Sequence, residues 1–385
     1  MLTSIAAPRL DSERGFLPLQ DPLIRLPRAF DDWESVALGL PKLFASDHLR
    51  RTLEKLPPFP VDQIATEAER ERAMTLLSYL GHAYVWRGAR PAEILPRRIA
   101  EPWHTVAESL GRPPVLSYSS YSLHNFSRFD PAREIECGNI ALIQNFLAGI
   151  DEEWFILIHV DIERKAAPGV AALHSCVDAA EAGDAEQLEQ RLSIAHAASE
   201  AMFATMKRMP EWCDPYVYYH RVRPYIHGWK NHPDLPRGLV YEGVAAYNGE
   251  PQQFRGETGA QSAIVPSLDA MLGIGHKEDM LRTYLMEMRT YMPPAHRAFI
   301  ESLEARGSVR AFVQNSGRAP LTEIYNSCVE SVERFRTLHL EFAASYIFRQ
   351  AQTDEKNPHA VGTGGTPFMQ YLKKHRDETT EHRLG

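Results

Sequence analysis

The stretch SVERFRTLHLEFAASYIF places a histidine at the centre of an apolar helical stripe. Val332, Phe335, His339, Phe342 and Tyr346 recur at steps of three and four, so they share one face of the predicted helix. A histidine on such a face is either a core residue bonded to a carbonyl or hydroxyl, or a ligand for a metal or haem iron. This stretch alone leaves both interpretations open.

A second group of candidates lies in YYHRVRPYIHGWKNHPDLPRGLVYEG, where Arg221 and Arg223 stand among histidines and aromatic residues. The segment is either a proline-bent connection whose aromatics fill the core, or part of a binding site. A buried arginine requires an anion, and its planar guanidinium suits the carboxylate of a side chain, a substrate or a haem propionate.

Two further features could belong to the same site. In WFILIHVDIE, Phe155 and His159 lie four residues apart on one predicted helical face. The glycine-rich run VGTGGT, which contains Thr363, is either a flexible linker or a lid that brings backbone close to a ligand. It lacks the spacing of a phosphate-binding loop. Together these features suggest an apolar pocket that tolerates an anion and is closed by a lid.

The composition excludes several classes of protein. With 385 residues and a net charge of −8, the chain would be repelled by a nucleic acid. Its four cysteines lie far apart without C-x-x-C spacing, which indicates free thiols in a reducing compartment. No signal-peptide core and no apolar run of roughly 18 residues is present. We therefore expect a cytoplasmic protein that binds neither membranes nor nucleic acid.

Long helical patterns dominate and β-alternation is almost absent, which predicts an all-α fold. Helices are expected over 66–86, 101–110, 168–182, 184–208, 262–273, 277–289, 294–315 and 319–350, with a long apolar stretch at 139–162. We expect residues 1–145 to form a smaller N-terminal domain that begins with an irregular arm. Residues 146–385 should form a helical catalytic domain with the lid near 353–366.

The motifs GWKNHPDLPRGLVYEG, MRTYMPPAHRAFIESLE, RFRTLHLEFAASYI and GTGGT occur in this order. With them the chain resembles the indoleamine 2,3-dioxygenases, haem enzymes that open the indole ring of tryptophan. The likeness runs from ILPRRIAEPW to GTGGTPFMQYLKK and is weak before it. It implies a two-domain helical fold, haem b as cofactor, and O2 with an indole as substrates. The cofactor would then supply the reactivity and the protein the positioning.

The resemblance also assigns roles to residues. His339 matches the axial ligand of the haem iron, and Arg336 with Asp269 matches a pair that braces this ligand. Arg223 matches the arginine that grips the substrate carboxylate. The remaining matches to the substrate site are Tyr118, Tyr121, Ser122, Phe155, Tyr218, Ile226, Thr258, Gly259 and Thr363.

Two positions depart from the best-known animal members of that family. His159 stands where those enzymes have serine, and resembles instead the distal histidine of tryptophan 2,3-dioxygenases, which reaches the indole N–H. Tyr218 and Tyr219 replace phenylalanines, which makes the predicted pocket more polar. We therefore expect His159 and Arg223 to be the side chains closest to the chemistry.

The sequence thus predicts a monomeric haem dioxygenase that converts L-tryptophan and O2 to N-formylkynurenine in the kynurenine pathway. One alternative is a related haem enzyme of secondary metabolism that oxygenates or rearranges a substituted indole. Another is a haem-binding protein without turnover, although such a protein would need neither a carboxylate clamp nor a lid.

Overall fold

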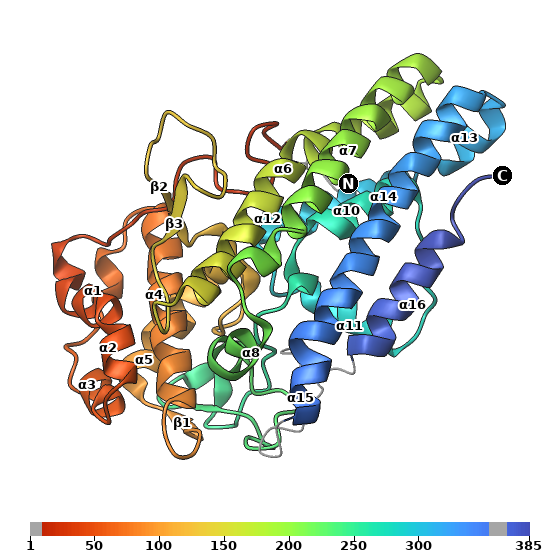
Figure 1. The fold of residues 1–385 in the computed structure, drawn as a ribbon. Helices are drawn as coiled ribbons and strands as arrows, with labels where there is room; N and C mark the ends of the chain where they lie inside the picture. Colours follow the sequence, from red (N-terminus) through yellow and green to blue (C-terminus); the bar gives the residue numbers. More distant parts are fainter. Residues whose placement is uncertain (1–9, 354–367) are drawn as a thin grey trace.

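The computed structural model describes residues 10–353 and 368–385, and its architecture is predominantly helical (Figure 1). The predicted all-α class is confirmed, because the described β-structure amounts to two small two-stranded sheets. One sheet pairs β1 and β4 in parallel, and the other pairs β2 and β3 antiparallel. Within the described ranges, no helix is both long and apolar enough to cross a membrane.

The N-terminal part consists of short helices around one long helix. Its elements are η1 (Arg28–Phe30), α1 (Asp31–Leu38), α2 (Leu40–Phe44), α3 (Leu49–Glu54), η2 (Val61–Gln63), α4 (Glu67–Trp86), β1 (Ile94–Leu95), α5 (Arg97–Ser109), η3 (Ser119–Leu123), β2 (Phe126–Arg128) and β3 (Ile140–Leu142). Helix α4 begins where the sequence indicates, because Thr66 and Glu69 form a reciprocal capping box. The core residues Trp33, Trp103 and Trp229 are fully buried on this side of the molecule.

The remaining chain forms a bundle of long helices with irregular connections. Its elements are α6 (Ile150–Glu181), α7 (Ala185–Met206), η4 (Met209–Glu211), α8 (Pro215–Val217), η5 (Tyr218–Val222), α9 (Arg223–Ile226), β4 (Val240–Tyr241), η6 (Ala245–Tyr247), η7 (Gly259–Gln261), α10 (Ile264–Leu272), α11 (Met280–Arg289), α12 (Pro294–Arg306), α13 (Arg310–Ser316), α14 (Ala319–Ala343), η8 (Ala344–Phe348), α15 (Arg349–Thr353) and α16 (Phe368–Thr380).

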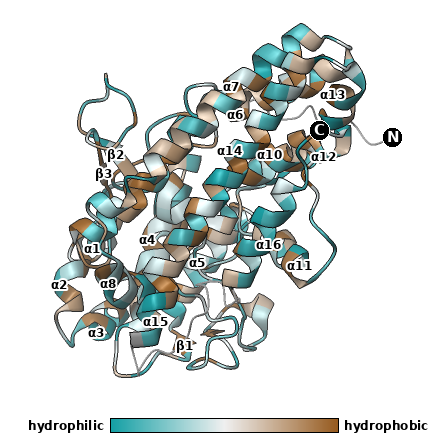
Figure 2. Ribbon diagram, turned by 45° about the vertical axis from the view of Figure 1, so that its right-hand side comes forward, coloured by the Kyte–Doolittle hydropathy of each residue, from teal (hydrophilic) through white to brown (hydrophobic). Residues whose placement is uncertain are grey.

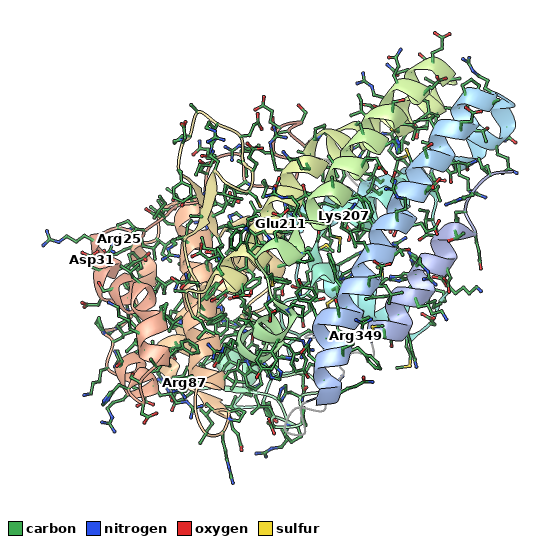
Figure 3. All side chains as sticks on the ribbon, in the orientation of Figure 1. Arg25, Asp31, Arg87, Lys207, Glu211 and Arg349 are labelled. Carbon is green, nitrogen blue, oxygen red and sulfur yellow. The ribbon has the colours of Figure 1, made fainter. Side chains whose placement is uncertain are left out.

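Helices α6, α7, α14 and α16 run alongside one another (Figure 1). Teal and brown residues are interspersed along these helices (Figure 2), as is typical of helices with one buried and one exposed face. Charged side chains such as Lys207, Glu211 and Arg349 reach outward into solvent (Figure 3). Close packing of α6 on α7 depends on Gly169, where an added Cβ would lie 2.7 Å from the Cβ of Ala198. A small residue is therefore required at this crossing.

Several predicted boundaries were wrong. Residues 150–162 of the expected apolar stretch are joined to the helix expected at 168–182 in α6, which continues through Pro168 because it packs along α7. Residues 139–149 precede this helix and contain β3. The helix expected over 294–315 is two helices, since Gly307 adopts φ +82° and ends α12. Helix α16 was not predicted at all. The division into domains at residue 145 stays a prediction.

Candidate functional site

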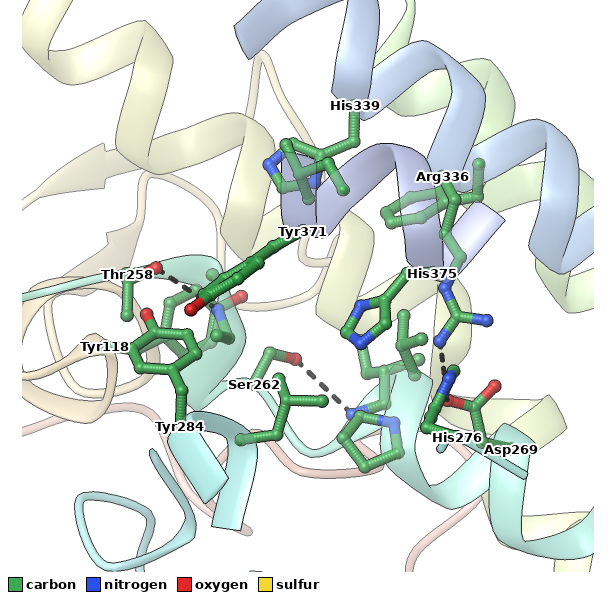
Figure 4. A pocket seen from close by; sticks show the side chains of 18 of the residues that line it. Tyr118, Thr258, Ser262, Asp269, His276, Tyr284, Arg336, His339, Tyr371 and His375 are labelled. Carbon is green, nitrogen blue, oxygen red and sulfur yellow. Dashed lines mark hydrogen bonds and ion pairs between the residues drawn. The ribbon is translucent and has the colours of Figure 1, made fainter. Parts of the chain in front are cut away.

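A cavity of about 600 Å³ lies inside the helical bundle. Its walls include residues of α6, α7, η5, α10, α11, α14, η8 and α16, the residue before η3, and the loop that leads into η7. Figure 4 shows side chains from these separate elements converging on it. Its volume falls in the range of small-molecule and cofactor sites.

His339 extends from α14 into this cavity (Figure 4). Its side chain is accessible and is one of those that line the cavity. Burial of the site, with a smaller contribution from His159, lowers the pKa of His339 to about 4. The imidazole is therefore neutral near pH 7. No hydrogen bond occupies either ring nitrogen within residues 10–353 and 368–385.

The apolar stripe that carries His339 lines the cavity instead of packing into a solid core. Phe335, Phe342 and Tyr346 border the cavity on the same helix face. After Ala343, α14 widens into the π-helical turn η8, which carries Tyr346. Such turns interrupt α-helices frequently at functional sites. The predicted face was correct, and of the two surroundings that this stretch left open, a packed core or a ligand site, the structure shows a cavity.

Arg336 and Asp269 form an ion pair in the cavity wall, with 2.6 Å between Arg336 Nη2 and Asp269 Oδ2. Although burial by itself raises the pKa of Asp269, Arg336 and His276 lower it to about 2. His276 lies between two carboxylates, 3.2 Å from Asp269 Oδ2 and 2.8 Å from Glu378 Oε2. Arg336 also donates to the Thr379 hydroxyl. The network therefore ties α10 and α14 to α16.

His159 lies on α6 and borders the cavity together with Phe155, Tyr118 and Tyr218. Its Nδ1 lies 2.7 Å from the carbonyl oxygen of Phe155, and burial lowers the pKa of the ring. The Phe155 and Tyr218 rings are tilted with centroids 4.5 Å apart, and the Tyr118 ring meets His159 edge-on at 6.0 Å. This end of the cavity is aromatic with a few polar atoms.

The sequence profile described as "Indoleamine 2,3-dioxygenase" matches residues 5–382. The chain is 34% identical to human indoleamine 2,3-dioxygenase 2, covering 99% of this chain and 96% of the relative. It is 36% identical to indoleamine 2,3-dioxygenase 1 of Rattus norvegicus, covering 97% and 94%. It is 31% identical to the 6-hydroxytryptophan 2,3-dioxygenase of Fusarium equiseti, covering 99% and 98%.

The chain belongs to the indoleamine 2,3-dioxygenase family.

Indoleamine 2,3-dioxygenases are haem-dependent dioxygenases, so the expected cofactor is confirmed. The cavity fits this group. It offers a neutral imidazole whose nitrogens are not engaged among the described residues, on a face of aromatic and aliphatic side chains. Neutral imidazole in apolar surroundings is the ligand that haem iron takes from histidine. His339 is the residue that would hold the iron.

The cavity does not include every residue assigned from the sequence. Thr258 and Gly259 border it, whereas Tyr121, Ser122, Arg223 and Ile226 are buried outside it. The guanidinium carbon of Arg223 lies 5.3 Å from the centre of the Tyr219 ring. Thr363 and most of the expected lid lie outside the described residues. The individual roles of all these residues in the indoleamine 2,3-dioxygenase reaction stay predictions.

Several residues of the site were missed by sequence reasoning. Glu257 borders the cavity beside Thr258, and burial raises the pKa of its carboxyl group to about 8. Glu163 lies behind the wall, where burial raises its pKa to about 7. Its position four residues after His159 on the same helix was the available signal. Nothing in the local sequence pointed to His276 or His375. These two rings lie side by side only because α16, which carries His375, packs against the segment of His276.

Proposed function

We propose that this protein cleaves the indole ring of L-tryptophan with O2 to give N-formylkynurenine, the product that enters the kynurenine pathway. The observation that carries the proposal is the presence of His339 and His159 on one aromatic cavity, contributed by α14 and α6. One histidine would hold the cofactor while the other lies among the rings that would contact an indole.

Haem, when bound through His339, supplies the activation of O2. The chain supplies the neutral ligand, and the ion pair of Arg336 with Asp269 fixes the helix one turn before it. Buried pairs of this kind orient a ligand rather than react. Enclosure by α16, from which Tyr371 and Leu372 border the cavity, would limit the access of water.

The substrate would be held by its ring and by its carboxylate. Phe155, Tyr118 and Tyr218 offer aromatic faces and edges to an indole. His159 offers an unprotonated Nε2, because Nδ1 is committed to the Phe155 carbonyl, and this nitrogen would accept the indole N–H. Arg223 is proposed to bind the carboxylate on the basis of its family match and its burial at 1% exposure.

A second candidate substrate is an indole with a polar ring substituent. Tyr118, Tyr218 and Glu257 add three polar groups to one end of the cavity. One relative is named as a 6-hydroxytryptophan 2,3-dioxygenase. A haem protein without turnover is a weaker candidate, because the cavity also contains groups suited to an indole.

The test is single-turnover oxygenation. Haem-loaded protein is reduced without oxygen, mixed with L-tryptophan or 6-hydroxytryptophan, and exposed to air, and the products are identified by mass. We expect N-formylkynurenine from tryptophan. Turnover of the hydroxylated substrate alone would favour the second candidate, and a stable oxygenated spectrum without product would favour a non-catalytic haem protein.

We further propose that the protein acts as a cytoplasmic monomer that binds no nucleic acid. All four cysteines are free, three of them buried, as suits a reducing compartment. The net charge of −8 disfavours contact with phosphate backbones. Size-exclusion chromatography with light scattering tests the monomer, and a second species at twice the mass would contradict it.

A further inference from the structure

Glu163 lies directly behind the cavity wall that carries His159. It is 1% exposed and does not border the cavity itself. Its Oε1 accepts hydrogen bonds from the hydroxyl groups of Tyr118, at 2.9 Å, and of Ser262, at 2.8 Å. Tyr118 and Ser262 both border the cavity. One carboxylate oxygen therefore accepts hydrogen bonds from two hydroxyl groups of the cavity wall.

These contacts determine where the hydroxyl protons point. An ionised carboxylate can only accept, so Tyr118 and Ser262 must both donate to Glu163. Burial is the main cause that raises the pKa of Tyr118 well above its usual value, and the neighbouring Glu163 raises it further. The phenol therefore keeps its proton. Within the described part of the chain, the buried Oε2 of Glu163 has no hydrogen-bond partner. If Glu163 were protonated, the proton would be bound to Oε2, and Oε1 would still accept the hydrogen bonds of Tyr118 and Ser262.

The proton of His159 is likewise bound on the side that faces the protein, which leaves an acceptor nitrogen. Its Nδ1 lies 2.7 Å from the Phe155 carbonyl oxygen, which can only accept, so the proton of the neutral ring is on Nδ1. Nε2 is then an acceptor. The rings of Tyr118 and His159 lie 6.0 Å apart on the same wall. The phenol oxygen, with its proton turned away, and the imidazole nitrogen thus both offer lone pairs.

We propose that Glu163 is a positioning residue that turns the Tyr118 hydroxyl proton away from the cavity, so that Tyr118 and His159 together select planar ligands presenting an N–H or O–H donor. This inference deepens the proposed function, on which it rests for the identity of the ligand as an indole amino acid. Glu163 itself touches neither substrate nor cofactor.

The test compares ligands that differ only in the donor. L-Tryptophan and 3-(benzofuran-3-yl)-L-alanine have nearly the same shape, but the second has a ring oxygen in place of N–H. Their Kd values are measured by optical titration of the haem band of the ferric holoenzyme. We expect wild type to prefer tryptophan by roughly tenfold, the value of one or two hydrogen bonds. Glu163→Leu should reduce this preference to about twofold or less, because the freed phenol can donate to the ring oxygen.

Conservative and matched variants separate positioning from a structural role. Glu163→Gln keeps an accepting oxygen and should retain the wild-type preference. Glu152 is the matched control, since it is an equally buried carboxyl group on α6 that accepts backbone N–H groups of Phe146 and Leu147. Glu152→Leu should leave the ratio of the two Kd values unchanged. Glu163→Met replaces Glu163→Leu if the latter yields no holoprotein.

A double-mutant comparison completes the test. Tyr118→Phe should lose the preference as Glu163→Leu does, and the double variant should lose no more than either. A wild-type ratio in haem-loaded Glu163→Leu, or losses that multiply in the double variant, would overturn the proposal. Free indole and benzofuran give the same comparison without the amino-acid group, so the role of Glu163 is tested even if wild type does not oxygenate tryptophan.

Discussion

His159 on α6 and His339 on α14 border the same cavity, close enough that His159 adds to the lowering of the His339 pKa. Both rings are therefore neutral near pH 7, and each can offer a lone pair. Two neutral imidazoles in one aromatic cavity can have separate roles: His339 would bind the cofactor, and His159 would contact the substrate.

His339→Ala should abolish stable haem binding and leave the helical fold intact, because the substitution removes the iron ligand from the cavity without opening a solid core. The haem-to-protein ratio and far-UV circular dichroism of the purified variant measure the two effects. His196→Ala is the control, since His196 bonds to Ser331 in the same bundle and does not border the cavity. A normal five-coordinate ferrous spectrum in His339→Ala would refute the assignment.

Arg223→Leu should weaken the use of L-tryptophan by roughly ten- to a hundredfold, because a charge-assisted pair in a closed site contributes about 1.5–3 kcal/mol. The loss should be much smaller for 3-methylindole, which has no carboxylate. The measurement is kcat/KM for both substrates, normalised to haem content. The exposed neighbour Arg221 provides the control Arg221→Leu. Equal losses for the two substrates would assign Arg223 to the fold or to a haem propionate.

Asp269 should make stability depend on pH at the acidic end. Its folded pKa is about 2, below the unfolded value of about 3.9, so its stabilising contribution is complete above pH 4 and is lost as pH falls toward 2. Asp269→Asn should remove about 2 kcal/mol near pH 7 and flatten this part of the profile. Urea unfolding between pH 2.5 and 7 checks it. Parallel profiles for variant and wild type would contradict the ion-pair account.

Gly169→Leu should destabilise the bundle by about 1–3 kcal/mol, since α6 and α7 approach too closely there for a larger side chain. Thermal unfolding of the variant measures the loss. Gly149→Ala is a suitable control, because no atom lies within 4 Å of a Cβ added at Gly149. If both variants unfolded at the wild-type temperature, the close packing of α6 on α7 at Gly169 would be contradicted.

Features that depend on local periodicity and on helix ends could be predicted from the amino-acid sequence. The capping box of Thr66 and Glu69 defines the start of α4, and steps of three and four place His339 on the apolar face of α14. These are properties of one helix and can be identified within a few turns of sequence. Family motifs then identified the kind of cofactor.

What that apolar face borders depends on how the helices pack together. Whether Phe335 and Phe342 meet a packed core or a cavity depends on helices distant in sequence, including α16. The hydrogen bonds of Glu163 join residues separated by 45 positions at Tyr118 and 99 at Ser262. No periodicity encodes such pairings, because they form only when α6, the segment before η3 and the loop after η7 are packed together.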